Sequence, residues 1–443
     1  NLGGELGQLT ARNHRNLDFL SQLYEQIGDH RRDRLLRRRK RVVKIECDKL
    51  RSWHVEESTV ESMRRLHNMT QAYDWGSTSD IPRFLGRSGT GEPVAEMWLG
   101  THPLAPSQVE TPDGLRPLSA VAGEIPFMLK ILAAEQPLSI QVHPSEAEAR
   151  EGFAREEAAG VPLDSPTRVF KDPHHKPEMV YALSTFDSLV GFRPTAEILR
   201  VFSQLDSPTV NAASSTLRAR PGFKGIVRVL ENLLLAPPAP SEIADIVIQC
   251  KALVHDGVDI KRAYSTAAMI ARHHPGDVGI VVSLLLNRFT LQPGEAIFLG
   301  TGIIHAHLSG LCLEAMANSD NVLRAGLTRK TLDVDGLIRS LGAGMARVAR
   351  VEPGYPSFST ELYSPAVDEF ALAVTQVSPA DPVGVDLIRA EHSIIMCIGG
   401  SVALTSAAGE KFTLSRGDAV YTDDADTDLT LHGTGEVAQI YLP

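Results

Sequence analysis

The sequence predicts a mainly β protein in which β-like regions lie before and after a helical region. Three observations support this prediction. Short β-like runs separated by Gly, Pro, Asp and Ser extend from residue 70 to 144, residues 194–275 are helical in pattern, and short alternating runs return from residue 347. The absence of strand–helix alternation and of a glycine-rich nucleotide loop argues against a dinucleotide-binding fold.

The composition is that of a globular protein with sizeable cores. The chain has 443 residues, of which 43% are hydrophobic and 22% charged, so we expect about two to four domains. The most apolar stretch, residues 279–286, is interrupted by Asn287 and is too short to cross a bilayer. Four distant cysteines without a CxxC pair exclude a disulfide framework and a thiolate zinc site. With no signal peptide visible, a cytoplasmic location is expected.

Residues 1–67 differ from the rest of the chain. They carry a net charge of about +5 against about −15 for the remainder, and residues 31–41 form a strongly basic block. One hypothesis is an RNA-binding arm, which predicts salt-sensitive RNA retention. We favour a disordered or non-native extension, because Met63 and Met69 stand just before the first globular pattern. We therefore expect neither nucleic acid nor membrane as a partner.

The first β block is predicted to contain strands at residues 127–132 and 138–143, on either side of a turn at 135–137. Residues 145–160 are rich in Ala, Glu and Arg and are predicted to be helical. Ser145 and Glu148 have the spacing of a capping box at the start of this helix.

Helices and further strands follow in the insertion and beyond it. Helices are expected at residues 195–205, 226–235, 241–253 and 261–273, the last ending at a His-Pro-Gly stop signal at 274–276. Strands are then expected at residues 280–286, 288–291 and 296–299, with a turn at 293–295.

The last block consists of short runs divided by glycine-containing turns. Gly399-Gly400, residues 408–409 and residues 416–418 are predicted turns. Evenly spaced short strands of this kind are typical of a sandwich or jelly roll. The strands are expected at residues 370–375, 393–398, 401–405, 411–414, 419–421 and 438–442.

Two pairs of side chains suggest a metal site. Gln141 and His143 are two residues apart in a β-like run and so share one strand face, as do His305 and His307. A divalent metal needs three or four nitrogen or oxygen donors converging from different strands. Without a nearby cysteine, such a site favours Zn²⁺ with an open coordination position. Spacing alone leaves this a hypothesis, because a single histidine is more often a packed or surface residue.

Several longer motifs occur together and in a defined order. Together they resemble the type I phosphomannose isomerases, and the resemblance extends over essentially residues 70–443. The motifs are Tyr73-Asp74-Trp75-Gly76-Ser77, residues 96–103, residues 126–130, residues 137–144, His175-Lys176-Pro177-Glu178, His305 and residues 314–328.

This resemblance implies two cupin-like, jelly-roll β domains with an α-helical insertion domain. Residues 68–193 with 277–340 would form the catalytic cupin-like domain, residues 194–276 the helical insertion, and residues 341–443 the C-terminal jelly roll. Residues 1–67 have no counterpart in the family and remain an extension.

The resemblance also implies an activity and a set of site residues. The family interconverts mannose 6-phosphate and fructose 6-phosphate, so we expect a zinc-dependent aldose–ketose isomerase acting through an enediol, a monomer whose reaction serves activated mannose synthesis. One Zn²⁺ per chain would be bound by Gln141, His143, Glu178 and His305. The implied catalytic residues are Arg324, Lys176 and Glu314, and the implied substrate-binding residues are Lys130, Ser139 and Lys330.

The sequence departs from the family pattern at two positions. His307 stands where the family has tyrosine and can compete with His305 as a ligand, and Arg329 replaces a proline beside Lys330. The general base stays open between Glu314, Lys176 and a water on the metal. Two other functions also remain: a non-haem iron dioxygenase, which oxygen uptake by an iron-loaded sample would reveal, and a non-catalytic sugar-binding protein.

Overall fold

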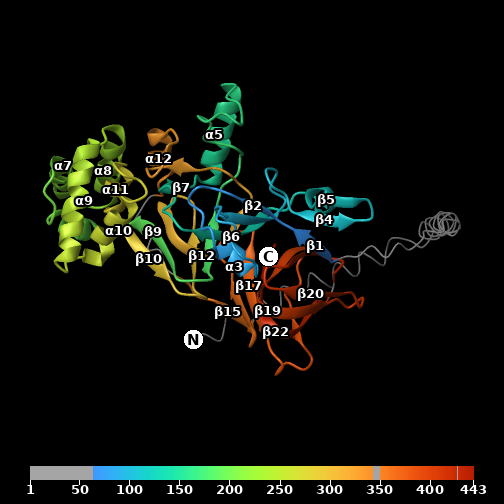
Figure 1. The fold of residues 1–443 in the computed structure, drawn as a ribbon. Helices are drawn as coiled ribbons and strands as arrows, with labels where there is room; N and C mark the ends of the chain where they lie inside the picture. Colours follow the sequence, from blue (N-terminus) through green and yellow to red (C-terminus); the bar gives the residue numbers. More distant parts are fainter. Residues whose placement is uncertain (1–62, 343–349, 427) are drawn as a thin grey trace, which may run out of the picture. The chain divides into compact units, whose positions relative to one another are not determined.

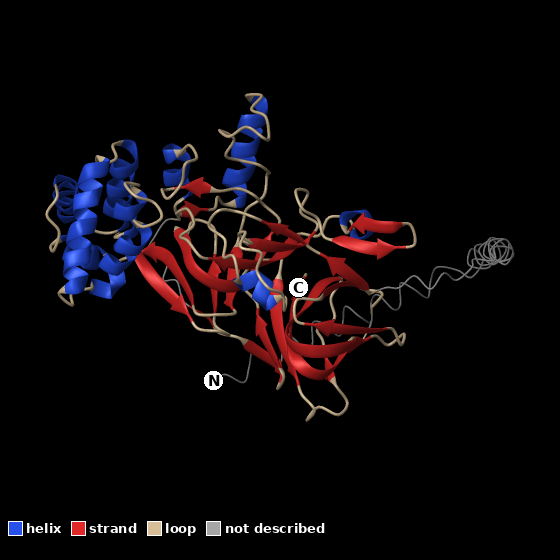
Figure 2. Cartoon of the chain, in the orientation of Figure 1, coloured by secondary structure: helices blue, strands red, loops and turns tan. Residues whose placement is uncertain are grey.

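The computed structural model describes residues 63–342, 350–426 and 428–443. The predicted extension lies outside this part of the chain as far as residue 62, and the basic block lies wholly outside it. Figures 1 and 2 show the elements along the chain. The helices are α3 (Asp80–Phe84), α4 (Ser119–Ala122), α5 (Glu146–Ala158), α6 (Thr195–Phe202), α7 (Pro208–Ala219), α8 (Phe223–Leu235), α9 (Pro240–His255), the 3₁₀ helix η1 (Ile260–Arg262), α10 (Ala263–Ile270), α11 (Gly279–Ser283) and α12 (Val334–Ser340).

The strands form two antiparallel sheets, as the mainly β prediction requires, and the fold prediction is confirmed. Sheet I contains β2 (Met69–Gln71), β3 (Glu96–Gly100), β6 (Phe127–Ala134), β7 (Gln141–Val142), β8 (Glu178–Ala182), β9 (Phe186–Phe192), β10 (Leu286–Leu291), β11 (Ala296–Leu299), β12 (His305–Ala317), β13 (Leu323–Arg324) and β14 (Arg350–Val351). Sheet II contains β1 (Arg64–His67), β4 (Gln108–Thr111), β5 (Gly114–Pro117), β15 (Gly354–Ser357), β16 (Thr360–Tyr363), β17 (Ala371–Val377), β18 (Val385–Asp386), β19 (His392–Thr405), β20 (Lys411–Ser415), β21 (Ala419–Asp423) and β22 (Thr430–Tyr441).

Strand alternation divides the side chains of sheet I between two faces. Leu129 and Ile131 of β6 belong to an apolar layer that also includes Ile394 and Ile440 of sheet II, so one face of sheet I packs against sheet II. Lys130, between Leu129 and Ile131, points to the opposite face. That second face carries the charged side chains described below.

Strand β12 connects two parts of sheet I. Its first residues pair with β7 and β9, whereas Gly310 to Ala317 pair with β6. Gly310 lies at the change of partners with φ of +119°, and a Cβ there would come within 2.5 Å of the Thr185 carbonyl oxygen. Glycine therefore suits this position, where one strand passes from one set of partners to another.

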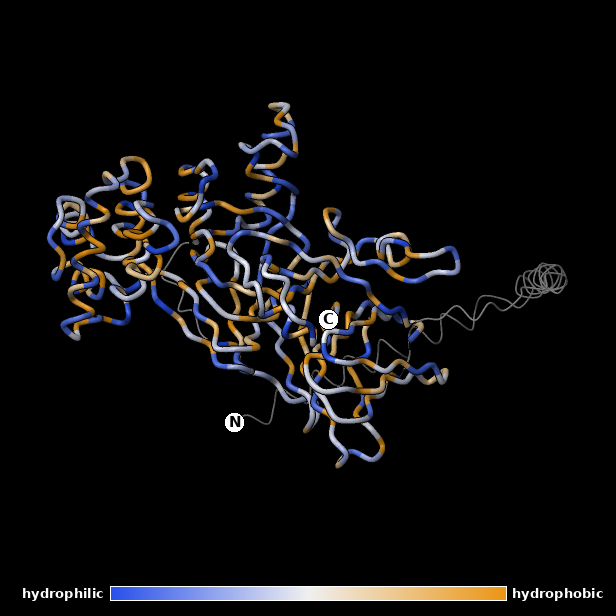
Figure 3. Tube along the Cα trace, viewed as in Figure 1, coloured by the Kyte–Doolittle hydropathy of each residue, from blue (hydrophilic) through white to orange (hydrophobic). Residues whose placement is uncertain are grey.

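The helical insertion comprises α6 to α10, and its apolar side chains share one core with strands of sheet I, among them Val142, Leu189 and Leu308. Helix α8 contributes Ile226, Val229 and Leu230 to this core, and Figure 3 shows hydrophobic and hydrophilic stretches alternating along these helices. Helix α7 was not predicted. Its start is fixed by Ser207, whose Oγ accepts a hydrogen bond from the Val210 amide.

The strand predicted at residues 280–286 is wrong, because residues 279–283 form helix α11. The Oδ1 of Asp277 accepts a hydrogen bond of 2.7 Å from the Gly279 amide at the start of this helix. All five residues of α11 are buried, and a fully buried apolar run has no periodicity that separates helix from strand. The helix predicted at 145–160 is confirmed, with the capping box of Ser145 and Glu148.

Gly399-Gly400 is also not a turn. Strand β19 runs continuously from His392 to Thr405, and its register against β22 shifts between Cys397 and Gly399. The two glycines form an irregularity within the strand, with Gly400 at φ of +70°. Residues 64–67, at the end of the predicted extension, form β1, which pairs with β21 and β4. Over the described ranges, no helix has the length and apolar character to cross a membrane.

Candidate active site

The register of sheet I places a row of functional side chains on its second face. Trp98 of β3 is opposite Lys130 of β6, and Lys130 is opposite Glu314 of β12. On the other side of β12, Met316 is opposite Glu178 at the start of β8. Glu178 and Glu314 are thereby carried on adjacent strands and point to the same face.

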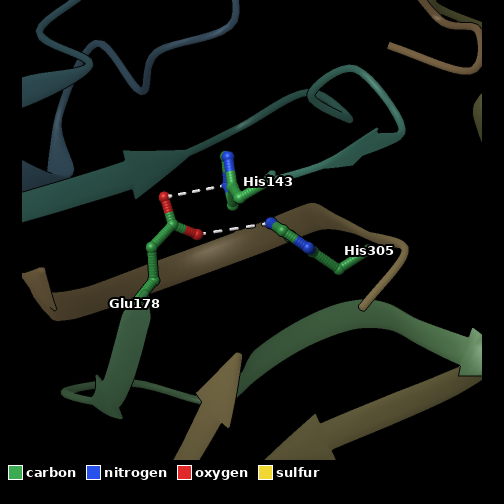
Figure 4. Close-up of side chains that lie close together, drawn as sticks. All are labelled: His143, Glu178 and His305. Carbon is green, nitrogen blue, oxygen red and sulfur yellow. Dashed lines mark ion pairs between the residues drawn. The ribbon is translucent and has the colours of Figure 1, made fainter. Parts of the chain in front are cut away.

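Three predicted metal ligands come together beside this row. The Nε2 of His143 lies 3.3 Å from Oε1 of Glu178, and the Nε2 of His305 lies 3.3 Å from Oε2 of the same carboxylate. Figure 4 shows the Glu178 carboxylate facing both imidazoles. All three side chains are buried, so the group is a compact nitrogen and oxygen donor set.

The outer nitrogens of both imidazoles fix their tautomers. The Nδ1 of His143 donates to the Asn321 carbonyl over 2.7 Å, and the Nδ1 of His305 donates to the Ile303 carbonyl over 2.9 Å. A carbonyl only accepts, so Nδ1 carries the proton and Nε2 of a neutral ring presents its lone pair. Burial lowers the pKa of His143 to about 4, so this ring is neutral at pH 7.

A divalent cation fits this donor set. Lone pairs on two Nε2 atoms face a carboxylate, and repulsion between them is relieved when a cation lies among them. His143 Nε2 and Glu178 Oε2 are buried and have no hydrogen-bond partner in the described part of the chain. The hydrogen bonds at Nδ1 are those that orient histidine ligands of metals.

Gln141 approaches the same point from β7. Its Nε2 lies 3.3 Å from the Nε2 of His305, and Gln141 is paired with His305 across the two strands. Because the two ends of an amide are assigned from hydrogen bonding, rotation of this amide presents Oε1 to the same place. Gln141 is thus positioned to supply a fourth donor.

Lys176 balances the charge of Glu178. Its Nζ donates to Glu178 Oε1 over 2.7 Å. Burial raises the pKa of Glu178, but Lys176 together with His143 and His305 outweighs burial and holds this pKa well below its ordinary value. Glu178 is therefore an ionised carboxylate in a buried setting.

A second charged group surrounds Glu314. The Nζ of Lys130 lies 3.5 Å from Glu314 and 3.7 Å from Glu96, and it is 5.0 Å from the centre of the Trp98 ring. Burial lowers the pKa of Lys130, but Glu96 and Glu314 outweigh it and raise this pKa. The pKa of Glu314 is lowered, because Lys130 and His307 overcome the effects of burial and of Glu178.

His307 belongs to this second group. Its Nε2 lies 3.2 Å from Glu314 Oε1, and its Nδ1 lies 3.2 Å from the Ser188 hydroxyl. Glu178, His307 and Glu314 also lie close enough to form a donor group of their own. The structure brings His305, rather than His307, to His143.

The remaining predicted residues are Arg324, Lys330 and Ser139. Arg324 of β13 is opposite Gln141 of β7, is half-buried, and has its pKa lowered by burial. Lys330 is exposed, and its pKa is lowered chiefly by the charge of Arg324. Ser139 precedes Gln141 by two residues, and the structure describes no hydrogen bond from its side chain to the other predicted site residues.

Two residues of the site had no role in the sequence analysis. Glu96 holds Lys130 and accepts from Trp98 Nε1 over 2.6 Å, and Asn321 orients His143. Both lie inside the motifs that carry the family resemblance, which was the available signal. Their roles became apparent only from the contacts in the structure.

Known proteins are similar to this chain in sequence and in fold. The family model described as phosphomannose isomerase type I, catalytic domain, matches residues 63–195. Mannose-6-phosphate isomerase of Shigella flexneri is 33% identical over 401 residues, covering 86% of this chain and 99% of the relative. Mannose-6-phosphate isomerase 1 of Arabidopsis thaliana is 28% identical, covering 86% and 94%. The structure of mannose 6-phosphate isomerase from Salmonella typhimurium bound to substrate and a zinc atom has a TM-score of 0.75 and 31% identity, covering 86% of this chain and 99% of that one.

Proposed function

We propose, because the chain belongs to the type I phosphomannose isomerase family, that it is a zinc-dependent mannose-6-phosphate isomerase. One observation carries the proposal. Two imidazoles whose Nδ1 atoms face carbonyl oxygens turn their Nε2 atoms toward the buried carboxylate of Glu178, each at 3.3 Å. Such a donor set supports one Zn²⁺ per chain, with His143, Glu178, His305 and Gln141 as the ligands we assign.

The donor set suits a catalytic zinc. One carboxylate and three neutral donors leave a net charge near +1 on the ion, because Zn²⁺ carries two charges. When bound, zinc supplies a positive charge that polarises a sugar oxygen or orients water.

The substrate we infer is a dianionic sugar phosphate, and the site offers cations to bind it. Arg324 is half-buried, and no carboxylate in the described residues forms an ion pair with it. A guanidinium always carries its charge and binds oxyanions through two parallel N–H groups. We therefore assign Arg324 to the phosphate or to the enediolate, with Lys330 beside it and with Ser139 and Lys130 as further substrate contacts.

Aldose–ketose isomerisation moves a proton between C1 and C2 through an enediol, so the site needs a base. Glu314 is ionised, since its pKa is lowered, and we assign it as the base. The Nζ of Lys176 donates a hydrogen bond to Glu178 over 2.7 Å, so we assign this ammonium group to stabilise negative charge on the substrate oxygens.

The test is a coupled assay for fructose 6-phosphate formed from mannose 6-phosphate, with and without a chelator. We expect activity to disappear on zinc removal and to return with Zn²⁺. In His143→Ala we expect loss of both zinc and turnover. A matched control is His392→Ala in sheet II, where this histidine pairs with the Tyr421 hydroxyl, and it should keep both. Turnover by metal-free His143→Ala would contradict the proposal, and iron in place of zinc in metal analysis would favour an oxygenase.

The enediol step is tested separately by running the reaction in ²H₂O. A base that exchanges its proton with solvent places deuterium at C2 of mannose 6-phosphate or C1 of fructose 6-phosphate. Complete retention of the original hydrogen, together with the absence of a solvent isotope effect, would argue for a hydride shift and against Glu314 as the base.

A further inference from the structure

Asn321 lies in the loop between β12 and β13 and is fully buried. A buried amide needs hydrogen-bond partners for both its oxygen and its nitrogen. All the partners of the Asn321 side chain lie in one segment, residues 171–174, which leads to Lys176 and Glu178.

The amide of Asn321 is nearly saturated by this segment. Its Oδ1 accepts from the Lys171 amide over 2.7 Å and from the Asp172 amide over 3.4 Å. Its Nδ2 donates to the Asp172 and His174 carbonyls, each over 2.8 Å, and to the Asp172 carboxylate over 3.1 Å. These contacts fix the path of the backbone shortly before Glu178.

Neighbouring contacts strengthen the attachment between the two loops. The Asp320 amide donates to the Asp172 carboxylate over 2.9 Å, and the Ser319 hydroxyl donates to the His174 carbonyl over 3.2 Å. The loop that carries Asn321 is therefore held along its length against residues 171–174.

The main chain of Asn321 serves a different residue. Its carbonyl accepts from His143 Nδ1 over 2.7 Å. His143 precedes α5 and Glu178 follows it, so the chain between them leaves the site and returns. Asn321 touches both ends of this excursion, one through its carbonyl and the other through its side chain.

We propose that Asn321 is a positioning residue of the metal centre, which sets the spacing between His143 and Glu178 by anchoring both through one buried residue. The inference rests on the proposed zinc function. Removing the amide frees residues 171–174 and the carbonyl that orients His143, so the two ligands lose their fixed separation. Losing such a supporting residue typically weakens metal binding about 10- to 100-fold.

The experiment measures zinc affinity directly, by competition with a chromophoric chelator, in the parent chain, Asn321→Ala and Asn321→Asp. Asn321→Asp keeps the shape and the accepting oxygen, but it loses the donations to two carbonyls and places a second carboxylate beside that of Asp172. The control is Gln439→Ala in sheet II, because Gln439 also has a buried side-chain amide. Its Oε1 accepts from the Ile388 amide over 3.2 Å, and its Nε2 donates to the Ile388 carbonyl over 2.6 Å. We expect about 10- to 100-fold weaker zinc binding in both Asn321 variants, an altered visible spectrum of their cobalt(II) forms, and parent-like values in the control.

The outcomes separate the two proposals. A parent chain that binds no zinc overturns the proposed function and this inference with it. A parent that binds zinc, with folded Asn321 variants within about twofold of it, overturns the inference alone, as does an equal loss in Gln439→Ala. If both variants fail to fold, hydrogen exchange on the parent decides. Zinc must then slow exchange of the Lys171 and Asp172 amides and leave residues 388–393 unchanged, and equal rates with and without zinc at 171–172 overturn the inference.

Discussion

Sheets I and II are both antiparallel, but they bury different chemistry. The strands of sheet I bury six acidic, basic or histidine side chains, whereas the buried polar side chains on the described strands of sheet II are amides and hydroxyls. In sheet I these are Glu96, Lys130, Glu178, His305, His307 and Glu314. In sheet II they are, tyrosines aside, Thr360, Thr375, Ser393, Thr422 and Gln439.

The difference shows how one architecture serves two purposes. Burying an ion pair costs desolvation energy that the attraction between the charges only partly offsets. Sheet I carries this cost on its second face, while its first face shares an apolar layer with sheet II. Sheet II therefore supports the sheet that holds the site, and substitutions in the two sheets should have separable effects.

The largest expected contrast follows removal of the central carboxylate. Glu178→Gln should weaken zinc binding by more than the roughly 100-fold that loss of a supporting residue costs, and turnover should fall with it. Chelator competition and the coupled assay measure both quantities. Thr375→Val is the matched change in sheet II, where the Thr375 hydroxyl pairs with Thr360 over 3.1 Å. Equal zinc affinity in the two variants would contradict the placement of the zinc site in sheet I alone.

The next effect is on folding stability. Lys130→Met leaves Glu96 and Glu314 buried without their shared counter-charge, so the free energy of unfolding should fall by about 3–5 kcal/mol. Urea denaturation measures this change. Thr375→Val should cost only about 1 kcal/mol, because it removes one neutral hydrogen bond. A loss in Lys130→Met no larger than in Thr375→Val would show that the buried charges of sheet I are not mutually dependent.

One carboxylate in each sheet should change the stability in opposite directions with pH. Burial raises the pKa of Asp187 in β9, but hydrogen bonds from Arg288 and Thr290 outweigh it, so this pKa lies below its ordinary value. Asp187 thus stabilises the fold above its unfolded pKa, and this stability is lost as pH falls through the folded pKa. In β22, burial raises the pKa of Glu436 above its ordinary value, so stability is lost as pH rises from the unfolded pKa through the folded pKa.

Urea unfolding at two pH values sharpens this contrast. Asp187→Asn should lower the unfolding free energy at pH 7 by about 1.5–3 kcal/mol, the value of a hydrogen bond to a charged group, and by less near pH 3. Glu436→Gln should raise the unfolding free energy at pH 7 and leave it unchanged near pH 4. If the unfolding free energy at pH 7 changed in the same direction in both variants, the opposite pKa shifts of Asp187 and Glu436 would be contradicted.

The smallest effect is expected in the apolar layer. Ile440→Val in β22 removes one methylene from a fully buried side chain, which should cost about 0.5–1.5 kcal/mol. Zinc affinity should stay at the parent value. A change in zinc affinity in this variant would mean that the shared layer transmits packing changes to the site.

The sequence could predict the fold class, most strands of the last block and the helix that begins after Ser145. It could not predict α11, because residues 279–283 are buried on every side and tertiary packing decided their conformation. Gly399 and Gly400 were expected to end a strand, yet hydrogen bonding to β22 continues across them. Local composition cannot show whether a partner strand is present on the other side.

The candidate site was proposed as a set of residues without an arrangement. The structure groups His143, Glu178 and His305 as expected, but the sequence alone left His305 and His307 equivalent, since they share a strand face. Their contacts separate them: His305 is opposite Gln141 of β7, whereas His307 contacts the Ser188 hydroxyl and Glu314. The role of Asn321 as a positioning residue could not be predicted, because its side-chain hydrogen bonds are to a segment far away in the sequence.

The pairing of β1 with β21 has a consequence for how the protein is made. Residues 64–67 leave the ribosome long before their partner, residues 419–423, because the two strands are far apart in the sequence. Until then one edge of β1 has no strand beside it, and an open edge is a template for contacts with other chains. Translation products that stop short of β21 should therefore aggregate or be degraded, because β1 then lacks this partner strand.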